Sequence, residues 1–483
     1  MFFNSIDFAI FLPVVFFLYW FVAHKNIAAQ NVLIVIASYV FYGWWDWRFL
    51  FLILFSTLTD YIVGLGLAKQ EDAVKRKILL GASVLVNLLF LGFFKYYNFF
   101  ADNFTRAFTL FGMSINAHHL NIILPVGISF YTFQTMSYSI DVYKKKLEST
   151  KDFIAFAAFV SFFPQLVAGP IERATNLLPQ FYTRRAFDYD KAVDGCKQML
   201  WGFFKKIVIA DNCAIYANMI FNNSGAYSGS TLVLGALFFT FQIYGDFSGY
   251  SDIAIGTSRL FGINLMQNFS YPYFSRDIAE FWRRWHISLT TWFRDYVYIP
   301  LGGSRRRTWI SIRNTFVIFI LSGFWHGANW TFIIWGFLNA VYFLPLLLLR
   351  KNRTHVEIAA KGKLLPSGGE LLGIIVTFGL TVFAWIFFRA EDFGHALSYI
   401  SRIFSGSLLT IPMFPRRRRA LITIILIIGF IAAEWLGREK RYVIADLWLK
   451  NKFLRVSLYF IVFLVICVCG NISESVEFIY FQF

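Results

Sequence analysis

The sequence MFFNSIDFAIFLPVVFFLYWFVAHK, residues 1–25, contains an apolar run long enough to enter a membrane. No basic segment precedes the run and no small-residue cleavage site follows it, so the sequence does not predict a removable signal peptide here. We expect it to remain attached as the first membrane helix. Similar runs recur along the 483-residue chain. A crossing needs about 20 apolar residues, and on that criterion the chain has roughly eleven to thirteen spanning or re-entrant segments.

Composition supports a membrane protein independently of any motif. Hydrophobic residues make up 58% of the chain and charged residues only 15%, whereas a soluble domain carries roughly 25% charged residues. No soluble domain, long linker or internal repeat separates the apolar runs. The sequence therefore predicts one all-α, polytopic membrane domain over residues 1–483.

The net charge of +17 does not indicate nucleic-acid binding, because the basic residues lie in short loops between apolar runs. KQEDAVKRK (69–77) and YKKKLESTK (143–151) are examples. Such loops face the cytoplasm and anionic lipid under the positive-inside rule. If residue 1 lies outside, the same count places the C-terminus outside too. The cluster RRRR (416–419) contradicts the rule there, but the basic loops on either side outweigh it.

Two carboxylates interrupt the apolar stretch FFTFQIYGDFSGYSDIAIG (238–256), namely Asp246 and Asp252. Polar groups at membrane depth are functional by default. Gly245 and Gly249 form a small-xxx-small pair, which lets another helix approach closely. The carboxylates are therefore expected either to hydrogen-bond within tight packing or to line a substrate tunnel.

Aromatic and basic residues alternate in EFWRRWHISLTTWFRDYVYIPLGGSRRR (280–307). At helical spacing one face would carry Trp282, Trp285, Leu289, Trp292, Phe293 and Tyr296, and the opposite face Arg283, Arg284 and Arg294. This pattern predicts an amphipathic helix with aromatic anchors at the cytoplasmic interface. Its basic face could bind the phosphates of a thioester donor, which makes Arg283 and Arg284 candidate donor-binding residues.

Two histidines are candidates for proton transfer, although each could instead be a packing residue. His286 lies on the aromatic side of the segment above, and His326 interrupts LSGFWHGANWTFIIWGFLN (321–339). An imidazole can take and return a proton near neutral pH, and burial keeps it in the neutral form that a general base requires. Trp325 and Asn329 flank His326 as candidates for tunnel lining or oxyanion stabilisation. The sequence contains no metal-binding motif, serine elbow or Walker motif.

Five segments together resemble the membrane-bound O-acyltransferase family, and specifically its alginate O-acetylation branch. They are ILPVGISFYTFQTMSYSIDVY (123–143), SFFPQLVAGPI (161–171), QIYGDFSGYSDIAIG (242–256), EFWRRWHISLTTWFRDYVYIPLGGSR (280–305) and FWHGANW (324–330). The resemblance implies a ring of helices around a central tunnel in a bacterial inner membrane. It implies transfer of an acyl group, in the first instance acetyl, from a cytoplasmic thioester such as acetyl-CoA to an extracytoplasmic polysaccharide. No bound cofactor is expected. The expected partners are membrane lipid, the polysaccharide and an SGNH-hydrolase-like acetyltransferase outside the membrane.

The resemblance also implies roles for single residues. His326 matches the family's catalytic histidine and His286 its second characteristic histidine. One departure is Asn339, which stands in WGFLNA where many relatives carry a further histidine. The tail FIYFQF (478–483) resembles the tail of a small companion protein of the D-alanylation system. Tyr480 is thus a candidate acyl relay, with an interfacial aromatic anchor as the alternative.

Three other functions stay open at this point. D-alanyl-type transfer to a cell-envelope polymer would use much the same motifs. An ion-coupled transporter would place Asp60, Asp246 and Asp252 on an ion path. A non-catalytic scaffold of a polysaccharide secretion complex would need none of these side chains for chemistry.

Overall fold

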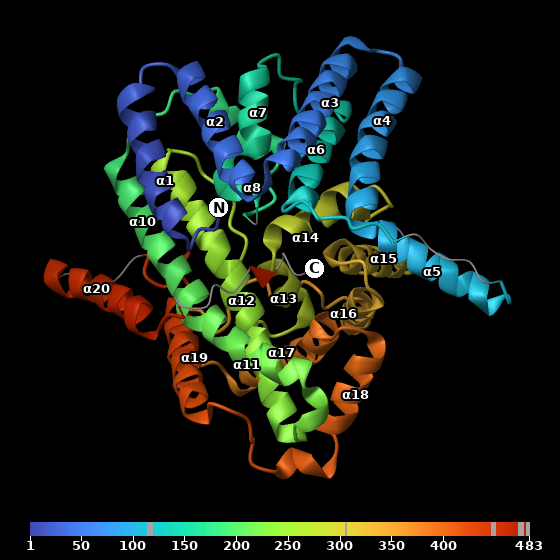
Figure 1. Ribbon diagram of the computed structural model, residues 1–483, viewed down its shortest axis with the longest axis vertical. Coiled ribbons are helices and arrows are strands. Elements are labelled where there is room, and N and C mark those ends of the chain that lie inside the picture. Colours follow the sequence, from blue (N-terminus) through green and yellow to red (C-terminus); the bar gives the residue numbers. More distant parts are fainter. Residues whose placement is uncertain (114–118, 168, 305–306, 446–450, 472–477, 480–483) are drawn as a thin grey trace. The chain divides into compact units, whose positions relative to one another are not determined.

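The computed structural model describes the chain except for six short segments: residues 114–118, 168, 305–306, 446–450, 472–477 and 480–483. Throughout the described residues every regular element is a helix, which confirms the all-α prediction (Figure 1). The chain forms two compact units. The first comprises Met1–Gly195 with Thr257–Met266, and the second Cys196–Gly256 with Gln267–Phe483.

Seven helices of the described chain are long and apolar enough to cross a membrane, which confirms a polytopic membrane protein. They are Ile27–Lys69, Ala73–Leu110, Gly229–Leu260, Trp330–Leu348, Gly368–Arg389, Arg417–Gly437 and Lys452–Cys469. A shorter apolar helix covers Ile6–Val22. Other apolar runs of the sequence fold into helices too short to span, such as α7 (Phe153–Ser161) and α8 (Phe163–Leu166).

A buried carboxylate organises the first unit. Here α3 (Leu50–Lys69) and α4 (Ala73–Leu91) form a hairpin that packs with α6 (Ile128–Tyr143) (Figure 1). Asp60 on α3 is fully buried. Its carboxylate accepts hydrogen bonds from the Ser139 hydroxyl at 2.6 Å and the Asn87 amide at 2.8 Å, as well as from the hydroxyl of Ser83. These bonds join the three helices and fix their register.

A long helical stretch is made of α10 (Tyr189–Phe203), a π-helical segment (Phe204–Ala210) and α11 (Asp211–Asn222). Within the second unit, its residues from Cys196 onward pack against the part of α12 (Gly229–Leu260) that ends at Gly256. A methyl group on Gly249 would lie 2.8 Å from the carbonyl oxygen of Gly202. One on Gly245 would lie 2.9 Å from that of Lys205. Both glycines thus allow the close helix approach that the small-xxx-small spacing predicts.

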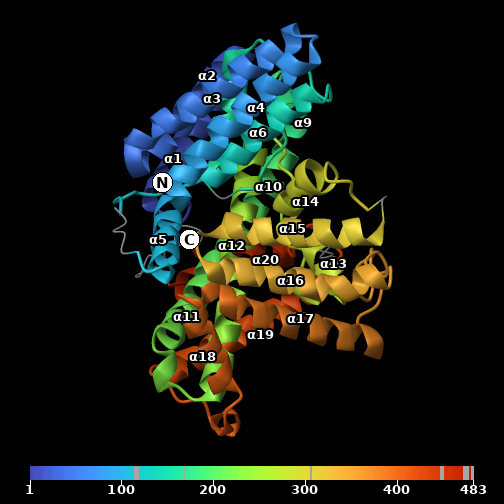
Figure 2. The same cartoon turned by 90° about the vertical axis from the view of Figure 1, so that its right-hand side faces the viewer.

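Two further helices of this unit carry part of the candidate site. The helices α15 (Thr308–His326) and α16 (Trp330–Leu348) lie side by side (Figure 2). The chain between them breaks at Gly327, whose backbone is extended. His326 is the last residue of α15 and lies directly before this break.

We expect Gly249→Leu to lower the free energy of unfolding by about 1–3 kcal/mol, because the new side chain would meet backbone atoms of the facing helix. Gly429 on α19 (Arg417–Gly437) provides a matched control, since nothing lies within 4 Å of a methyl group placed there. Thermal unfolding in detergent should show a lower Tm for Gly249→Leu than for Gly429→Leu. Equal Tm values would contradict the close approach.

Candidate functional site

The segment 280–307 does not form the continuous amphipathic helix that its spacing predicts. It contains α13 (Ile278–Arg284), α14 (Ile287–Phe293) and a π-helical turn (Arg294–Tyr298). Between α13 and α14, His286 adopts a left-handed backbone with φ of 44°. Such a conformation costs of order 1–3 kcal/mol for a residue other than glycine and persists only where its surroundings impose it.

The break also changes the surroundings of the aromatic residues. Trp282, Trp285 and Trp292 are buried within the second unit, so the prediction of interfacial anchors is wrong. A helical face stays continuous only while the helix does. The Trp282 indole N–H donates to Oδ1 of Asn339 at 3.2 Å, and the Asn339 amide donates to the carbonyl of Trp335 at 2.8 Å. Asn339 thus supports the packing of these two indoles.

The structure brings the two predicted histidines together. The ring centroid of Trp325 lies 6.0 Å from that of His286 and 4.9 Å from that of His326. Both histidines are buried, at 1% and 4% exposure respectively. One indole therefore contacts two imidazoles that come from segments 40 residues apart in the sequence.

His286 is held in an aromatic and largely apolar environment. Its ring lies perpendicular to that of Phe247 at a centroid distance of 4.6 Å, and its Nδ1 lies 3.1 Å from Oδ1 of Asn268. Burial lowers the pKa of His286 to about 3. The imidazole is therefore neutral at physiological pH, which is the form that can accept a proton. Sequence reasoning missed Asn268, whose loop position carries no periodic signal.

Gly327 and Asn329, both beside His326, make structural contacts. A side chain on Gly327 would collide with the ring of Phe332, so this glycine accommodates the protein's own packing. Asn329 caps the start of α16. Its Oδ1 accepts from the backbone N–H of Thr331 at 3.1 Å, and its amide donates to the carbonyl of Glu391 at 2.7 Å. Both ends of this amide are engaged, which disfavours Asn329 as an oxyanion donor.

The carboxylates of α12 form ion pairs with two consecutive buried lysines, and Asp246 is itself buried whereas the Asp252 side chain is 14% exposed. Lys205 lies 2.6 Å from Asp252, and Lys206 lies 2.8 Å from Asp246. Lys206 is also 2.8 Å from Asp211. Opposite charges compensate the cost of burying each of them. The geometry thus matches the packing interpretation of these aspartates.

Asp246 also contacts the end of the chain. Its Oδ2 accepts a hydrogen bond from the backbone N–H of Ile479 at 2.7 Å. The preceding residue, Phe478, packs against Tyr250 and Phe247 with ring centroids 4.7 and 6.0 Å away. Phe247 is the ring that meets His286. Tyr480 itself lies outside the described residues.

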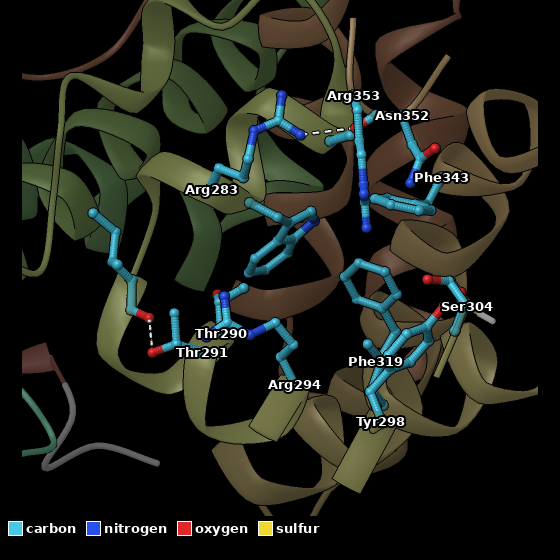
Figure 3. Close-up of a pocket in the computed structure, with 15 residues that line it drawn as sticks. Arg283, Thr290, Thr291, Arg294, Tyr298, Ser304, Phe319, Phe343, Asn352 and Arg353 are labelled. Atoms are coloured by element: carbon cyan, nitrogen blue, oxygen red, sulfur yellow. Dashed lines mark hydrogen bonds between the residues drawn. The ribbon is translucent and has the colours of Figure 1, made fainter. Parts of the chain in front are cut away.

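A basic pocket of about 470 Å³ opens in the second unit (Figure 3). It is lined by Ala279, Trp282, Arg283, Ile287, Thr290, Thr291, Arg294, Tyr298, Ser304, Thr315, Ile318, Phe319, Phe343, Asn352 and Arg353. Arg283 and Arg294 lie on the side of α13 and α14, and Arg353 lies opposite them (Figure 3). Three guanidinium groups and several hydroxyls around an aromatic wall suit an anionic ligand with an apolar part.

The two arginines predicted to bind the donor have different surroundings. Arg283 lines the pocket and donates to the carbonyls of Asn352 at 2.8 Å and His355 at 2.6 Å. Arg284 is not among the lining residues. Its guanidinium donates to Oε1 of Glu280 at 3.1 and 2.8 Å, and this carboxylate is 1% exposed. Arg284 therefore neutralises a buried charge.

Aromatic contacts connect the pocket with the histidines. Trp282 in the pocket wall lies 5.6 Å from Trp335, whose ring lies 5.2 Å from that of His326. Ile287, also in the wall, directly follows His286. Two indoles in edge-to-face contact thus lie between the pocket and His326. The described part of the chain contains no group of three or more His, Cys, Asp or Glu side chains arranged to hold a metal ion.

Known proteins match this chain over most of its length. The model of the membrane-bound O-acyltransferase family matches residues 142–388. A probable alginate O-acetylase of Pseudomonas aeruginosa is 43% identical over 84% of this chain and 75% of its own length. A peptidoglycan O-acetyltransferase of Helicobacter pylori is 35% identical over 81% of this chain and 77% of its own. A teichoic acid D-alanyltransferase of Bacillus subtilis is 29% identical over 57% and 71%.

Proposed function

The chain belongs to the membrane-bound O-acyltransferase family, and from that premise we propose that it passes an acetyl group from a cytoplasmic thioester toward an extracytoplasmic polysaccharide. It is a multi-pass membrane O-acyltransferase. The observation that carries the proposal is the pair of buried histidines that both contact Trp325, beside a basic pocket. We propose that both compact units form one acyltransferase.

A thioester is already an activated acyl donor. The protein therefore has to supply mainly a base that deprotonates the attacking hydroxyl. A hydroxyl oxygen attacks the thioester carbonyl carbon, and the hydroxyl proton passes to an imidazole. The carbon–sulfur bond then breaks, and the imidazolium returns its proton to the departing thiolate, which restores the neutral base. We assign the base to His326, with His286 as the second catalytic histidine. A well-placed general base contributes about 10²–10⁴-fold to the rate.

His326→Ala should therefore abolish acyl transfer from acetyl-CoA while leaving membrane insertion and purified yield near those of the wild type. His24→Ala is the matched control, since this histidine is exposed in a loop of the first unit. Release of CoA by the purified protein, together with transfer of labelled acetyl, measures the effect. Retention of more than about a tenth of the activity would exclude His326 as the general base, whose loss should cost at least 10²-fold.

We propose that the basic pocket binds the phosphates of the donor. Acetyl-CoA and a carrier-bound phosphopantetheine thioester share this chemistry. The three arginines around the pocket provide charge complementarity, and guanidinium groups match phosphate oxygens in geometry. The aromatic wall of Trp282, Phe319 and Phe343 offers an apolar surface to the rest of the donor.

Arg283→Ala combined with Arg294→Ala should raise the apparent KM for acetyl-CoA with a smaller effect on kcat, because phosphate contacts are made in both the ground state and the transition state. Arg284→Ala serves as the comparison. It should instead lower Tm, because it removes a cation from buried Glu280. An unchanged KM in the double variant would assign Arg283 to holding the loop at Asn352 and His355.

We further propose that the chain's own tail relays the acyl group through Tyr480. The support is that Ile479, the residue before it, is anchored on Asp246, and that Phe478 packs on the ring that meets His286. A phenol needs a base to become a nucleophile, and the buried histidines are the nearest candidates along this chain of contacts.

Tyr480→Phe removes one oxygen and keeps the aromatic ring, so the variant should fold and bind donor but deliver no acetyl group outside. Labelled acetyl-CoA should leave wild-type protein with label that survives denaturation and is released by alkali, as an ester is. The Phe variant should carry none. Normal acetylation of the glycan in cells expressing Tyr480→Phe would contradict the relay and favour an aromatic anchor.

The remaining assignments follow from the same premise. We propose a bacterial inner-membrane location with both termini outside, and an SGNH-hydrolase-like acetyltransferase outside the membrane as the partner that completes transfer. The acceptor would be a polysaccharide of the kind modified by the two O-acetylating relatives. D-alanyl transfer is less supported, since that relative shares less of the chain. An ion-coupled transporter is also less supported, because Asp246 and Asp252 are already paired with Lys206 and Lys205.

A further inference from the structure

Asn268 forms a compact group of hydrogen bonds around the turn that carries His286. It is fully buried in the second unit. Its Oδ1 lies 3.1 Å from Nδ1 of His286, 2.9 Å from the hydroxyl of Ser288 and 3.3 Å from the backbone nitrogen of Ser288. Its Nδ2 lies 3.1 Å from the hydroxyl of Ser251 on α12. The backbone carbonyl of Asn268 accepts from the N–H of Ile287 at 2.9 Å.

The orientation of the Asn268 amide follows from these neighbours. An asparagine oxygen and nitrogen are told apart by their hydrogen-bond partners. The backbone N–H of Ser288 can only donate, so the amide atom that faces it must be the oxygen. The amide nitrogen then faces Ser251, whose hydroxyl can accept. Turning the amide over would set two donors against each other in a buried site, which costs about 1–3 kcal/mol.

The orientation of the amide decides the protonation of the imidazole. An oxygen without a hydrogen can only accept, so the Nδ1 of His286 that faces it must carry the ring proton. In a neutral imidazole the other nitrogen, Nε2, then holds the lone pair. The Ser288 hydroxyl oxygen also lies 3.4 Å from Nδ1. This hydroxyl donates its hydrogen to Oδ1 of Asn268 at 2.9 Å, so toward Nδ1 it can only accept, which again requires a proton on Nδ1. The rings of Phe247, Phe269 and Trp325 also contact the imidazole.

We propose that Asn268 is a positioning residue that fixes His286 as the Nδ1–H tautomer, with Nε2 as its basic nitrogen. The inference rests on the proposed catalytic role of His286. Asn268 acts in two ways. Its side chain determines which ring nitrogen of His286 is basic. Its backbone carbonyl accepts a hydrogen bond from the N–H of Ile287, directly after His286, and this bond holds the left-handed turn and with it the ring in place.

A direct test does not depend on activity. Nitrogen-15 NMR of histidine-labelled, full-length protein in detergent, with His286→Gln to assign the signal, should show Nδ1 protonated and Nε2 unprotonated at neutral pH. Asn268→Leu should yield a mixture of tautomers or the opposite one. Observation of the Nε2–H tautomer in the wild type would overturn the proposal.

Two variants test the consequence for acetyl transfer from acetyl-CoA. Asn268→Leu should lower kcat by roughly tenfold to a hundredfold with KM little changed, which is less than the loss of a general base. Asn268→Asp keeps an acceptor for Nδ1 and Ser288, so most of the activity at alkaline pH should return. A carboxylate beside the ring favours the imidazolium and raises its pKa by about 1–3 units. The acid limb of the pH–rate profile should therefore move to higher pH in the Asp variant.

If Asn268 had a role in packing alone, Asn268→Asp would leave the pH–rate profile unchanged. Asn223 is exposed, so Asn223→Asp is the control for the added negative charge. If His286→Ala keeps full activity, the proposed function of His286 fails and the inference fails with it. If His286→Ala is inactive while Asn268→Asp titrates like the wild type, the inference alone is overturned.

Discussion

The ion pairs between α12 and the two consecutive lysines are the interaction on which the second unit depends. Lys205 and Lys206 lie on the π-helical segment that faces Gly245 and Gly249, so backbone contact and charge pairing occur at the same place. Burying one of these charges alone would cost several kcal/mol, whereas pairing compensates that cost only when the geometry is good. The absence of side chains on the two glycines provides that geometry. Close packing and charge compensation therefore require each other.

Further functional elements are arranged along the same helix. Asp246 binds Lys206 through one carboxylate oxygen and the backbone of Ile479 through the other. The next residue, Phe247, packs on His286, and Ser251 one turn later holds the amide of Asn268. A shift of α12 by a single turn would disturb all of these contacts together. We infer that the buried charges set the register of the site as well as the stability of the unit.

The sequence predicted those features that depend on residue type, and missed those that depend on the path of the backbone. Apolar run length predicted an all-helical membrane protein, and the spacing of Gly245 and Gly249 predicted a close helix contact. The amphipathic helix over 280–307 was wrong, because periodicity contains no signal for the left-handed residue at His286. The break gives the adjacent residues Arg283 and Arg284 different surroundings, one in a pocket and one on Glu280. Asn268 was missed because its partners come from other segments.

The placement of the tail bears on how an acyl group could leave so enclosed a site. The two histidines are buried. A site enclosed in this way would protect a thioester from hydrolysis but would also exclude a bulky polymer. A nucleophile carried on the chain's own tail would avoid this conflict, because tethering replaces a bimolecular encounter with an intramolecular one. The effective concentration of such a group is highest when the tether is short and its end is fixed. Ile479 is fixed by the same carboxylate that pairs with Lys206, so a relay would depend on the buried ion pair that orders the rest of the unit.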